Sequence, residues 1–333
     1  IIIFQQENIN TLKMAIIPSS YQAPKHLFNK HIETIYPYLF RRVRGVLYAR
    51  ERITTPDNDF IDIDWVKNGS RRLVIISHGL EGSANSGYIK GMAKAFSGRH
   101  WDVLAWNYRG CSGEPNRKVY AYHAGATHDL SLVIQHALQK NEYDSVCLIG
   151  FSLGGNLTLK YLGEQSNYIH EKIKSAVVFS TPCDLKSSSL HLSKGINKVY
   201  AQRFLTSLKQ KVVDKAKILP EQVNVSFLSE IKTLIDFDDI YTAPVHGFID
   251  ALDYYTKCSS QLFIPYVTIP TLIINAQNDS FLPASCYPIK LVETHAFVHL
   301  EMPQQGGHVG FYSNDKKGLY WSEERALYFV EQY

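Results

Sequence analysis

Short apolar runs alternate with helix-like segments through the middle of the chain. Four or five consecutive apolar residues between polar or turn-forming residues are typical of strands that are covered on both faces. Between these runs, apolar residues recur every three or four positions, which is the spacing of one helical face. The runs that predict strands are 73–76, 103–106, 146–149, 176–179, 272–274 and 297–300, and the segments that predict helices are 88–96, 127–138, 155–162 and 321–333.

This alternation predicts an α/β fold with a mostly parallel sheet and helices on both of its faces. The alternation stops between Pro182 and Pro265, where the chain is polar, rich in Lys and Ser, and helix-like from 199 to 217. We therefore expect a helical cap insertion at about 182–265, with a return to the sheet at 269–270. Its apolar residues at helical spacing should face inward, either only to pack on the main domain or also to line a pocket; they include Tyr200, Phe204, Leu205 and Leu208.

The chain before the first predicted strand shows a different pattern. Its apolar residues fall roughly on one helical face: Leu27, Phe28, Ile32, Ile35, Tyr36, Leu39 and Phe40. This face predicts a helix that packs against the main domain; the alternative is a peripheral lipid contact, helped by the arginines that follow. We assign 26–333 to the main domain and 1–25 to an N-terminal extension. Within that extension, Met14 is a candidate start that leaves 1–13 as an upstream, non-native segment.

Composition narrows the class of protein. The chain has 333 residues, of which 45% are hydrophobic and 20% charged, and this suits a large core rather than disorder. The net charge of +4 is small for this length, and no long run of Lys and Arg predicts a nucleic-acid partner. The five cysteines are widely spaced without a CxxC pair, which favours a reducing compartment, the cytoplasm. No apolar run approaches the roughly 20 residues of a transmembrane helix.

A G-x-S-x-G motif follows the predicted strand 146–149 and opens the predicted helix that starts near Gly155. It reads Gly150-Phe151-Ser152-Leu153-Gly154. A serine on such a sharp strand-to-helix turn projects its hydroxyl above the sheet, and the turn needs very small flanking residues. The helix N-terminus beneath adds amide donors and a partial positive charge, which favour an oxyanion. This context predicts Ser152 as the nucleophile of an α/β-hydrolase fold.

The base and the acid follow from chain order. In this fold the triad appears in the order serine, acid, histidine, and each partner lies on a loop after a late strand. His308 lies in a glycine-rich loop after the predicted strand 297–300, and Asp279 follows the predicted strand 272–274. Either residue alone would more often be a surface or turn residue, but the order and the placement favour catalysis. Asp238 and Asp239 compete as the acid, although they precede the strand that should carry it.

The loop after the predicted strand 73–76 contains a His-Gly pair that predicts an oxyanion hole. We assign the two backbone donors to Leu80 in this loop and to Leu153, the residue after the nucleophile. His78 is expected to brace the loop by hydrogen bonding rather than to act as a base. His123, His128 and Asp129 could suggest metal ligands, but no H-E-x-x-H run accompanies them. We expect no metal and no cofactor.

Longer runs resemble the YheT-type branch of the α/β-hydrolases. They are HGLEGS at 78–83, NYRGCSGEPNR at 107–117, GFSLGGN at 150–156 and GGHVGF at 306–311, and the segments 26–42, 237–239 and 242–248 also resemble this branch. The branch includes bacterial predicted hydrolases, fungal medium-chain ester synthase/esterases, and animal monoacylglycerol and phospholipid lipases. The resemblance implies an esterase of acyl esters with Ser152, Asp279 and His308 as its triad.

The sequence thus predicts a serine hydrolase that cleaves short- to medium-chain carboxylic esters through an acyl-enzyme. A small acyl ester is the expected partner, and the sequence leaves the oligomeric state open. The alternatives are an acyltransferase that passes the acyl group to an alcohol, and a non-catalytic binding protein of the same fold. The run from Arg109 to Glu114 either lines the pocket or locks a loop, and we favour the loop.

Overall fold

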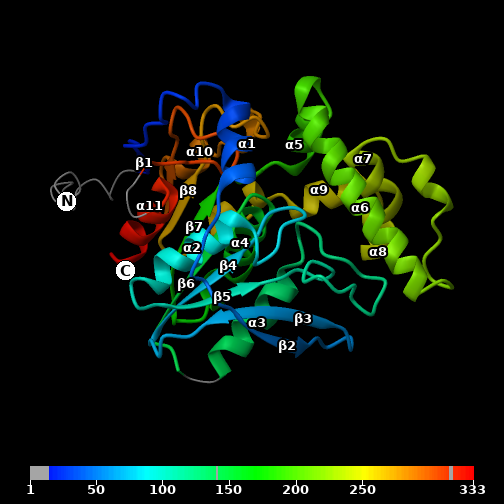
Figure 1. Ribbon diagram of the computed structural model, residues 1–333, viewed down its shortest axis with the longest axis horizontal. Helices are drawn as coiled ribbons and strands as arrows, with labels where there is room; N and C mark the ends of the chain where they lie inside the picture. Colours follow the sequence, from blue (N-terminus) through cyan, green and yellow to red (C-terminus); the bar gives the residue numbers. More distant parts are fainter. Residues whose placement is uncertain (1–14, 140–141, 315–317) are drawn as a thin grey trace.

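A computed structural model describes residues 15–139, 142–314 and 318–333. Within these residues the strands form one nine-stranded sheet in the order β1-β9-β8-β7-β6-β4-β5-β3-β2 (Figure 1). The strands β1, β9, β8, β7, β6, β4 and β5 run parallel to one another. At the far side of the sheet, β3 is antiparallel to β5, and β2 is antiparallel to β3. The predicted α/β fold with a mostly parallel sheet is therefore confirmed.

Each apolar run that predicts a strand forms one, and these are β4 to β9. The strands are β1 (Ile16–Ile17), β2 (Ala49–Thr54), β3 (Phe60–Val66), β4 (Arg72–Ser77), β5 (Asp102–Trp106), β6 (Ser145–Phe151), β7 (Ile173–Phe179), β8 (Thr271–Ile274) and β9 (Val298–Glu301). The α-helices are α1 (Lys30–Phe40), α2 (Gly87–Ser97), α3 (Thr127–Gln139), α4 (Leu153–Gln165), α5 (Leu185–Leu192), α6 (Lys198–Ile218), α7 (Leu234–Phe237), α8 (Ala243–His246), α9 (Ala251–Cys258), α10 (Ile289–Val292) and α11 (Trp321–Val330).

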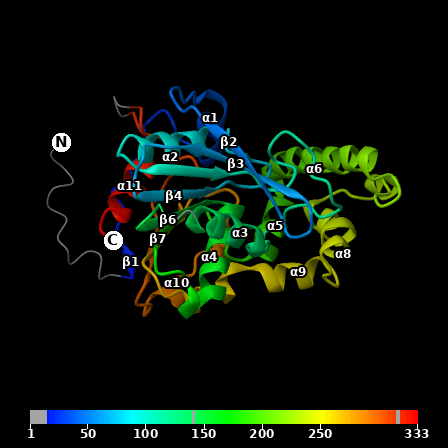
Figure 2. The same cartoon turned by 90° about the horizontal axis from the view of Figure 1, so that it is seen from below.

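Helices cover both faces of the sheet, which explains the continuous apolar runs. Leu73 and Ile75 of β4 belong to the core cluster that contains residues of α3, α4 and α10. Val74 and Ile76 point to the opposite face, where they join residues of α2 and α11 (Figure 2). Alternate residues of one strand thus enter two separate cores. Each fully buried Val, Leu or Ile contributes roughly 1.5–3 kcal/mol relative to an exposed one.

The antiparallel strands β2 and β3, which end one side of the sheet, were not predicted. Their sequences place charged residues between apolar ones, and the structure pairs these charges across the two strands. Arg52 Nε lies 2.7 Å from Asp62 Oδ1, and Arg50 Nε lies 2.8 Å from Asp64 Oδ1. Both aspartates are only 2% exposed. Pairing with the arginines thus allows both aspartates to be buried in β3, although their sequence pattern is typical of an exposed strand.

The described part of the predicted N-terminal extension belongs to the sheet. Ile16 and Ile17 form β1, which pairs in parallel with β9 at Leu300 and Glu301. Tyr21 follows and packs on the ring of Trp321, with 5.1 Å between the ring centroids. Residues 15–25 therefore lie within the main domain rather than outside it. The candidate start at Met14 and the segment before it lie outside the described residues.

The helix predicted before the first strand, α1, packs against the main domain, but not through the whole apolar face that its pattern indicates: Leu27 is buried, whereas Ile35 and Leu39 are exposed. The buried residues of α1 are Glu33 and Pro37. In contrast, Phe28, Leu39 and Phe40 are exposed by 76%, 47% and 64%. The physical reason lies in Glu33, whose carboxylate binds loops of the sheet, so that the helix turns its polar edge inward and its apolar edge outward.

The segment between β7 and β8 forms a helical cap. It contains α5 to α9 and lies where the sequence predicts an insertion, at the end of the molecule opposite the C-terminus (Figures 1 and 2). Leu205, Val212, Ile231 and Phe237 are buried in a core of the cap's own, which also takes in Phe281 from the main domain. The cap is therefore a packed unit that also contacts the sheet domain.

The cysteines at 111, 147, 183, 258 and 286 are free and buried. Burial raises the pKa of Cys111 to about 11 and that of Cys183 to about 12. These two thiols therefore stay protonated at neutral pH, where they behave as small apolar side chains. Among the helices of the described residues, none is both long enough and apolar enough to cross a membrane.

A buried ion-pair network locks the loop that begins at Arg109. The guanidinium of Arg109, 4% exposed, donates to both carboxylate oxygens of Asp129 at 2.9 Å and to Asp57 at 2.7 Å. Its Nη1 also lies 3.4 Å from Asp59. Burial alone would raise the pKa of Asp57, but hydrogen bonds from Arg109 and Thr55 outweigh it and lower the pKa to about 2. Arg109 thus locks the loop and does not line the cavity described below.

This network makes a prediction about stability. Arg109→Met should lower the free energy of unfolding by about 3–5 kcal/mol, because it leaves buried carboxylates without their partner. Arg71→Met is the matched control, since Arg71 and its partner Asp144 are both exposed and its loss should change little. Chemical denaturation of both variants measures the difference. Equal stability of the two variants would mean that the network does not hold the fold.

Candidate active site

Ser152 occupies the tight turn between β6 and α4. Its backbone angles are φ 53° and ψ −117°, a strained conformation for a residue with a side chain. A Cβ atom on Gly150 would come 2.5 Å from the carbonyl oxygen of Gly154, and one on Gly154 would come 2.5 Å from that of Ser77. The turn therefore requires glycine at both positions. It places Ser152 at the end of β6, where the residue lines a large cavity.

The structure brings the three predicted residues Ser152, His308 and Asp279 together. His308 Nε2 lies 2.9 Å from Ser152 Oγ, and His308 Nδ1 lies 2.9 Å and 3.1 Å from the two carboxylate oxygens of Asp279. The Asp279 side chain is fully buried. The ring of Phe281 stacks on the imidazole, with 4.0 Å between the ring centroids. In this arrangement the imidazole can take a proton from the serine while the carboxylate fixes its orientation.

Helix α1 holds the loops that carry His308 and Asp279. Glu33 Oε2 accepts a hydrogen bond from the amide of Gly306 at 2.6 Å and one from Asn278 Nδ2 at 2.9 Å. Thr34 Oγ1 accepts one from the amide of His308 at 2.9 Å. The sequence analysis missed these positioning residues. Glu33 is the one acidic residue in the basic and apolar segment 25–44. This isolation is the local sequence signal that its carboxylate is buried and binds amide groups.

Two backbone amides near Ser152 are free to bind an anion. The N–H groups of Leu80 and Leu153 have no acceptor within the part of the chain that the structure describes, and both residues line the cavity beside Ser152. The amides that flank Leu80 are both occupied, since those of Gly79 and Glu81 donate to tyrosine hydroxyl groups. The predicted donors are therefore available, and the loop around Leu80 is fixed on both sides.

His78 braces this loop, as the sequence analysis expected. The amide of Tyr108 donates to His78 Nε2 at 3.2 Å, so the other ring nitrogen carries the proton and faces the carbonyl oxygen of Gly79 at 2.8 Å. The side chain is completely buried, and burial lowers the pKa of His78 to about 3. A neutral imidazole locked by two hydrogen bonds cannot reach Ser152 as a base.

The competing acids Asp238 and Asp239 bind other partners in the cap. Asp238 accepts a hydrogen bond from the hydroxyl of Tyr255 at 2.6 Å, and Asp239 accepts one from the amide of Ala251 at 2.9 Å. Burial raises the pKa of Asp238 to about 6. No hydrogen bond joins either carboxylate to His308 within the described residues.

The residues considered as metal ligands are engaged in other contacts. Both carboxylate oxygens of Asp129 bind Arg109. The rings of His123 and His128 lie 6.5 Å apart, and burial lowers the pKa of His123 well below its usual range. In the described ranges, no three His, Cys, Asp or Glu side chains are grouped so that they could hold a metal ion.

A polar clamp joins the cap to the loop beside Leu80. Lys211 of α6 donates to Glu81 Oε1 at 2.7 Å, and Ser207 of the same helix donates to Glu81 Oε2. The hydroxyl of Tyr122 also donates to Glu81 Oε1 at 2.7 Å. Because Glu81 follows Leu80 directly, the position of α6 is tied to the position of a free amide. The sequence analysis did not foresee this link.

The cavity between the cap and the sheet domain measures about 1690 Å³. This exceeds the roughly 300–1,000 Å³ of common small-molecule sites, so a long ligand can enter. Of the cap residues expected to face inward, Tyr200, Phe204 and Leu208 line the cavity, whereas Leu205 is buried in the cap core. Residues of α1 form another part of the wall. The wall of the cavity thus combines apolar side chains of the cap with Ser152, His308 and the loop residues Leu80 and Leu153.

Known proteins share this fold and much of this sequence. A family model described as the alpha/beta hydrolase fold matches residues 72–315. YheT of Escherichia coli, which is named as an esterase, is 36% identical over 290 residues, or 85% of this chain and 84% of that protein. The monoacylglycerol lipase of Saccharomyces cerevisiae is 26% identical over 295 residues, or 86% of this chain and 64% of that protein. The fold of an esterase from Pyrococcus furiosus matches with a TM-score of 0.57 at 16% identity, over 88% of this chain and 98% of that one. The chain therefore belongs to the α/β-hydrolase fold family and, within it, to the YheT-like branch.

Proposed function

We propose that this protein is a serine esterase that hydrolyses carboxylic esters through an acyl-enzyme. Ser152 is the nucleophile, His308 the general base and Asp279 the residue that orients the base. The observation that carries the proposal is the unbroken hydrogen-bond chain from Asp279 through His308 to Ser152, which ends in an apolar cavity. The names of the relatives YheT and monoacylglycerol lipase also favour an ester substrate.

The reaction proceeds in two steps, acylation of Ser152 and hydrolysis of the acyl-enzyme. His308 Nε2 takes the Ser152 proton as Oγ attacks the acyl carbon, and the amides of Leu80 and Leu153 bind the oxyanion. Each such donor contributes about 3 kcal/mol to the stability of the transition state. The imidazolium then protonates the leaving alcohol, which leaves the acyl group on Ser152. Water then attacks this ester while His308 Nε2 takes one of its protons, and the imidazolium returns that proton to Ser152 Oγ as the bond between Oγ and the acyl carbon breaks, which releases the carboxylic acid and restores the serine.

The acyl chain that we propose is of short to medium length, as the sequence predicts, and the cavity is large enough to hold it. Phe204 and Leu208 of the cap and Leu80 and Leu153 of the sheet domain supply an apolar wall around Ser152. Burial of one methylene group gains about 0.8 kcal/mol, which is close to a fourfold gain in affinity. The sequence left open whether water or an alcohol receives the acyl group. We propose water as the acceptor.

The nucleophile is tested by substitution and covalent labelling. Ser152→Ala should lower turnover of p-nitrophenyl butyrate by about 10³- to 10⁶-fold, as in other triads. A fluorophosphonate probe should label the wild type and not the variant. Ser189→Ala is the matched control, because Ser189 lines the same cavity and its loss should leave labelling intact. Labelling that persists in Ser152→Ala would move the nucleophile to another residue.

The acid is tested by comparing two aspartates. Asp279→Asn should lower kcat by roughly 10⁴-fold, because the imidazole loses the carboxylate that fixes its tautomer and orientation. Asp239→Asn should leave kcat close to that of the wild type, since this carboxylate binds a backbone amide in the cap. Steady-state kinetics of both variants measure the difference. The reverse pattern, with Asp239→Asn inactive and Asp279→Asn active, would assign the acid to the cap.

The role of the cap is tested with p-nitrophenyl esters of rising acyl length. The value of kcat/KM should rise from acetyl toward medium chains until the cavity is filled. Phe204→Ala should shift the preferred length, because Phe204 lines the cavity and packs edge-on against Phe281. Lys217→Ala, on the same helix but outside the cavity, should keep the wild-type profile. A profile that peaks at acetyl for all three proteins would remove the cap from substrate selection.

A further inference from the structure

Two segments at the mouth of the cavity expose large apolar side chains. Around α1, Phe28, Tyr38 and Phe40 are exposed by 76%, 59% and 64%. At the start of α6, Ile196 and Val199 are exposed by 61% and 69%. Contiguous exposed apolar residues of this kind mark an interaction surface. Tyr38 and Val199 also line the cavity, so the surface lies at its entrance.

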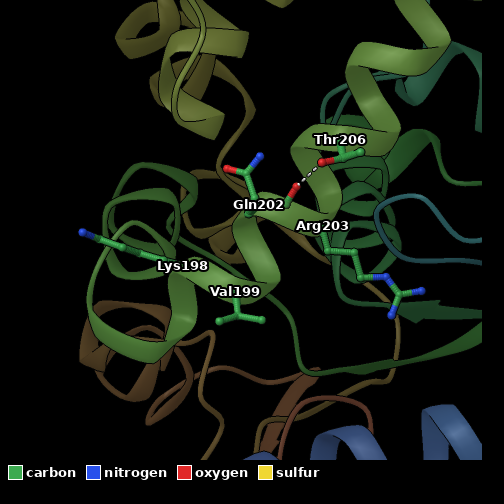
Figure 3. A pocket seen from close by; sticks show the side chains of 5 residues that line it. All are labelled: Lys198, Val199, Gln202, Arg203 and Thr206. Carbon is green, nitrogen blue, oxygen red and sulfur yellow. Dashed lines mark hydrogen bonds between the residues drawn. The ribbon is translucent and has the colours of Figure 1, made fainter.

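Direct contacts between α1 and α6 make this one surface. The hydroxyl of Tyr200 lies 3.0 Å from His31 Nδ1. Arg203 donates to the hydroxyl of Tyr38, and its guanidinium carbon lies 4.4 Å from the centre of the Tyr38 ring. Figure 3 shows Lys198, Val199 and Arg203 projecting from the first turns of α6. We call the exposed apolar set the mouth face; it consists of Phe28, Ile35, Tyr38, Leu39, Phe40, Ile196 and Val199.

The two segments are also strongly basic. Residues 25–44 contain five Lys and Arg and one acid, Glu33, which is buried. Residues 185–213 contain six Lys and Arg and no Asp or Glu. Together they carry eleven of the 35 basic residues of the chain and one of its 31 acids, although the whole chain has a net charge of only +4. Two of the eleven are neutralised by acids outside these segments, since Arg41 pairs with Glu323 and Lys211 with Glu81. The positive charge next to the mouth face therefore comes from exposed residues such as Arg42, Arg44, Lys194 and Lys198.

We propose that the mouth face binds the surface of an anionic phospholipid bilayer. The apolar side chains enter the boundary between headgroups and acyl chains, and basic side chains such as Arg42, Lys194 and Lys198, which are exposed, contact the lipid phosphates. Charge favours this occupant over a second copy of the chain. A symmetric dimer through this face would bring two basic patches together without acids to neutralise them. The binding goes beyond ester hydrolysis and does not require it.

Co-sedimentation with lipid vesicles tests the proposal. The full chain carries Ser152→Ala so that lipid cleavage does not alter the vesicles. It should sediment with vesicles of phosphatidylglycerol mixed with phosphatidylcholine, and much less with vesicles of phosphatidylcholine alone. High salt should weaken the binding, because it screens exposed charges. Failure to bind the anionic vesicles at low salt would overturn the proposal.

Substitutions on the mouth face locate the binding. The double variant Phe28→Ser and Phe40→Ser should weaken binding to anionic vesicles at least tenfold, because it removes apolar side chains that enter the bilayer. The double variant Lys194→Glu and Lys198→Glu should have the same effect, because each basic residue near an anionic surface contributes roughly fivefold. The matched control is Tyr168→Ser with Leu262→Ser. These two residues are exposed by 90% and 51% but lie outside the cavity mouth, so their loss should leave binding unchanged.

Thermal melting and gel filtration of the same variants complete the test. Equal melting temperatures show that the variants are folded. Neither vesicle binding nor melting depends on catalysis, so a failed esterase assignment would leave this test intact. Equal vesicle binding by the control and both mouth-face variants would overturn the proposal. A dimer that dissociates when Phe28 and Phe40 are replaced would assign the face to a second copy instead.

Discussion

The close approach of two backbone turns governs the whole site. The turn at Ser152 lies against the loop after β4, and only glycine at Gly154 lets the Ser77 carbonyl come so near. The same contact brings the loop that carries Leu80 close to Ser152, since a Cβ atom on Gly79 would lie 3.2 Å from that of Ser152, although the two belong to loops on different strands. The strained φ of Ser152 is tolerated because α4, β6 and β7 hold both ends of the turn. A larger residue at Gly154 would separate the two loops, and the free amides with them.

The second half of the site depends on an element far away in sequence. Helix α1 fixes the loops of His308 and Asp279 through Glu33 and Thr34, while its opposite edge forms part of the mouth face. One helix therefore contacts both the catalytic loops and the entrance. The cap is connected in a similar way, because Lys211 and Ser207 hold Glu81 next to Leu80. Both walls of the cavity are thus tied to loops that carry the proposed catalytic groups.

Local sequence signals were enough to predict the strands β4 to β9 and to pick out Ser152, Asp279 and His308, which the fold brings together. Continuous apolar runs predicted β4 to β9, and the flanking strand and helix gave Ser152 its context. The predictions failed where burial depends on distant partners. Asp62 and Asp64 read as polar until arginines of β2 are placed beside them. The apolar pattern of α1 indicated only part of its buried side, since nothing near Glu33 in sequence reveals the amides it binds. Such buried charges can be recognised only once the loops are in place.

The central claim is that an acyl group passes onto Ser152 and is then released to water. Rapid mixing of the wild type with p-nitrophenyl butyrate, followed by an acid quench and mass spectrometry, tests it most directly. The account predicts a mass increase of one butyryl group, located on the peptide that contains Ser152, which decays to the free enzyme with release of butyrate. A butyryl group on another residue, or p-nitrophenol release with no acylated protein at any time, would contradict it.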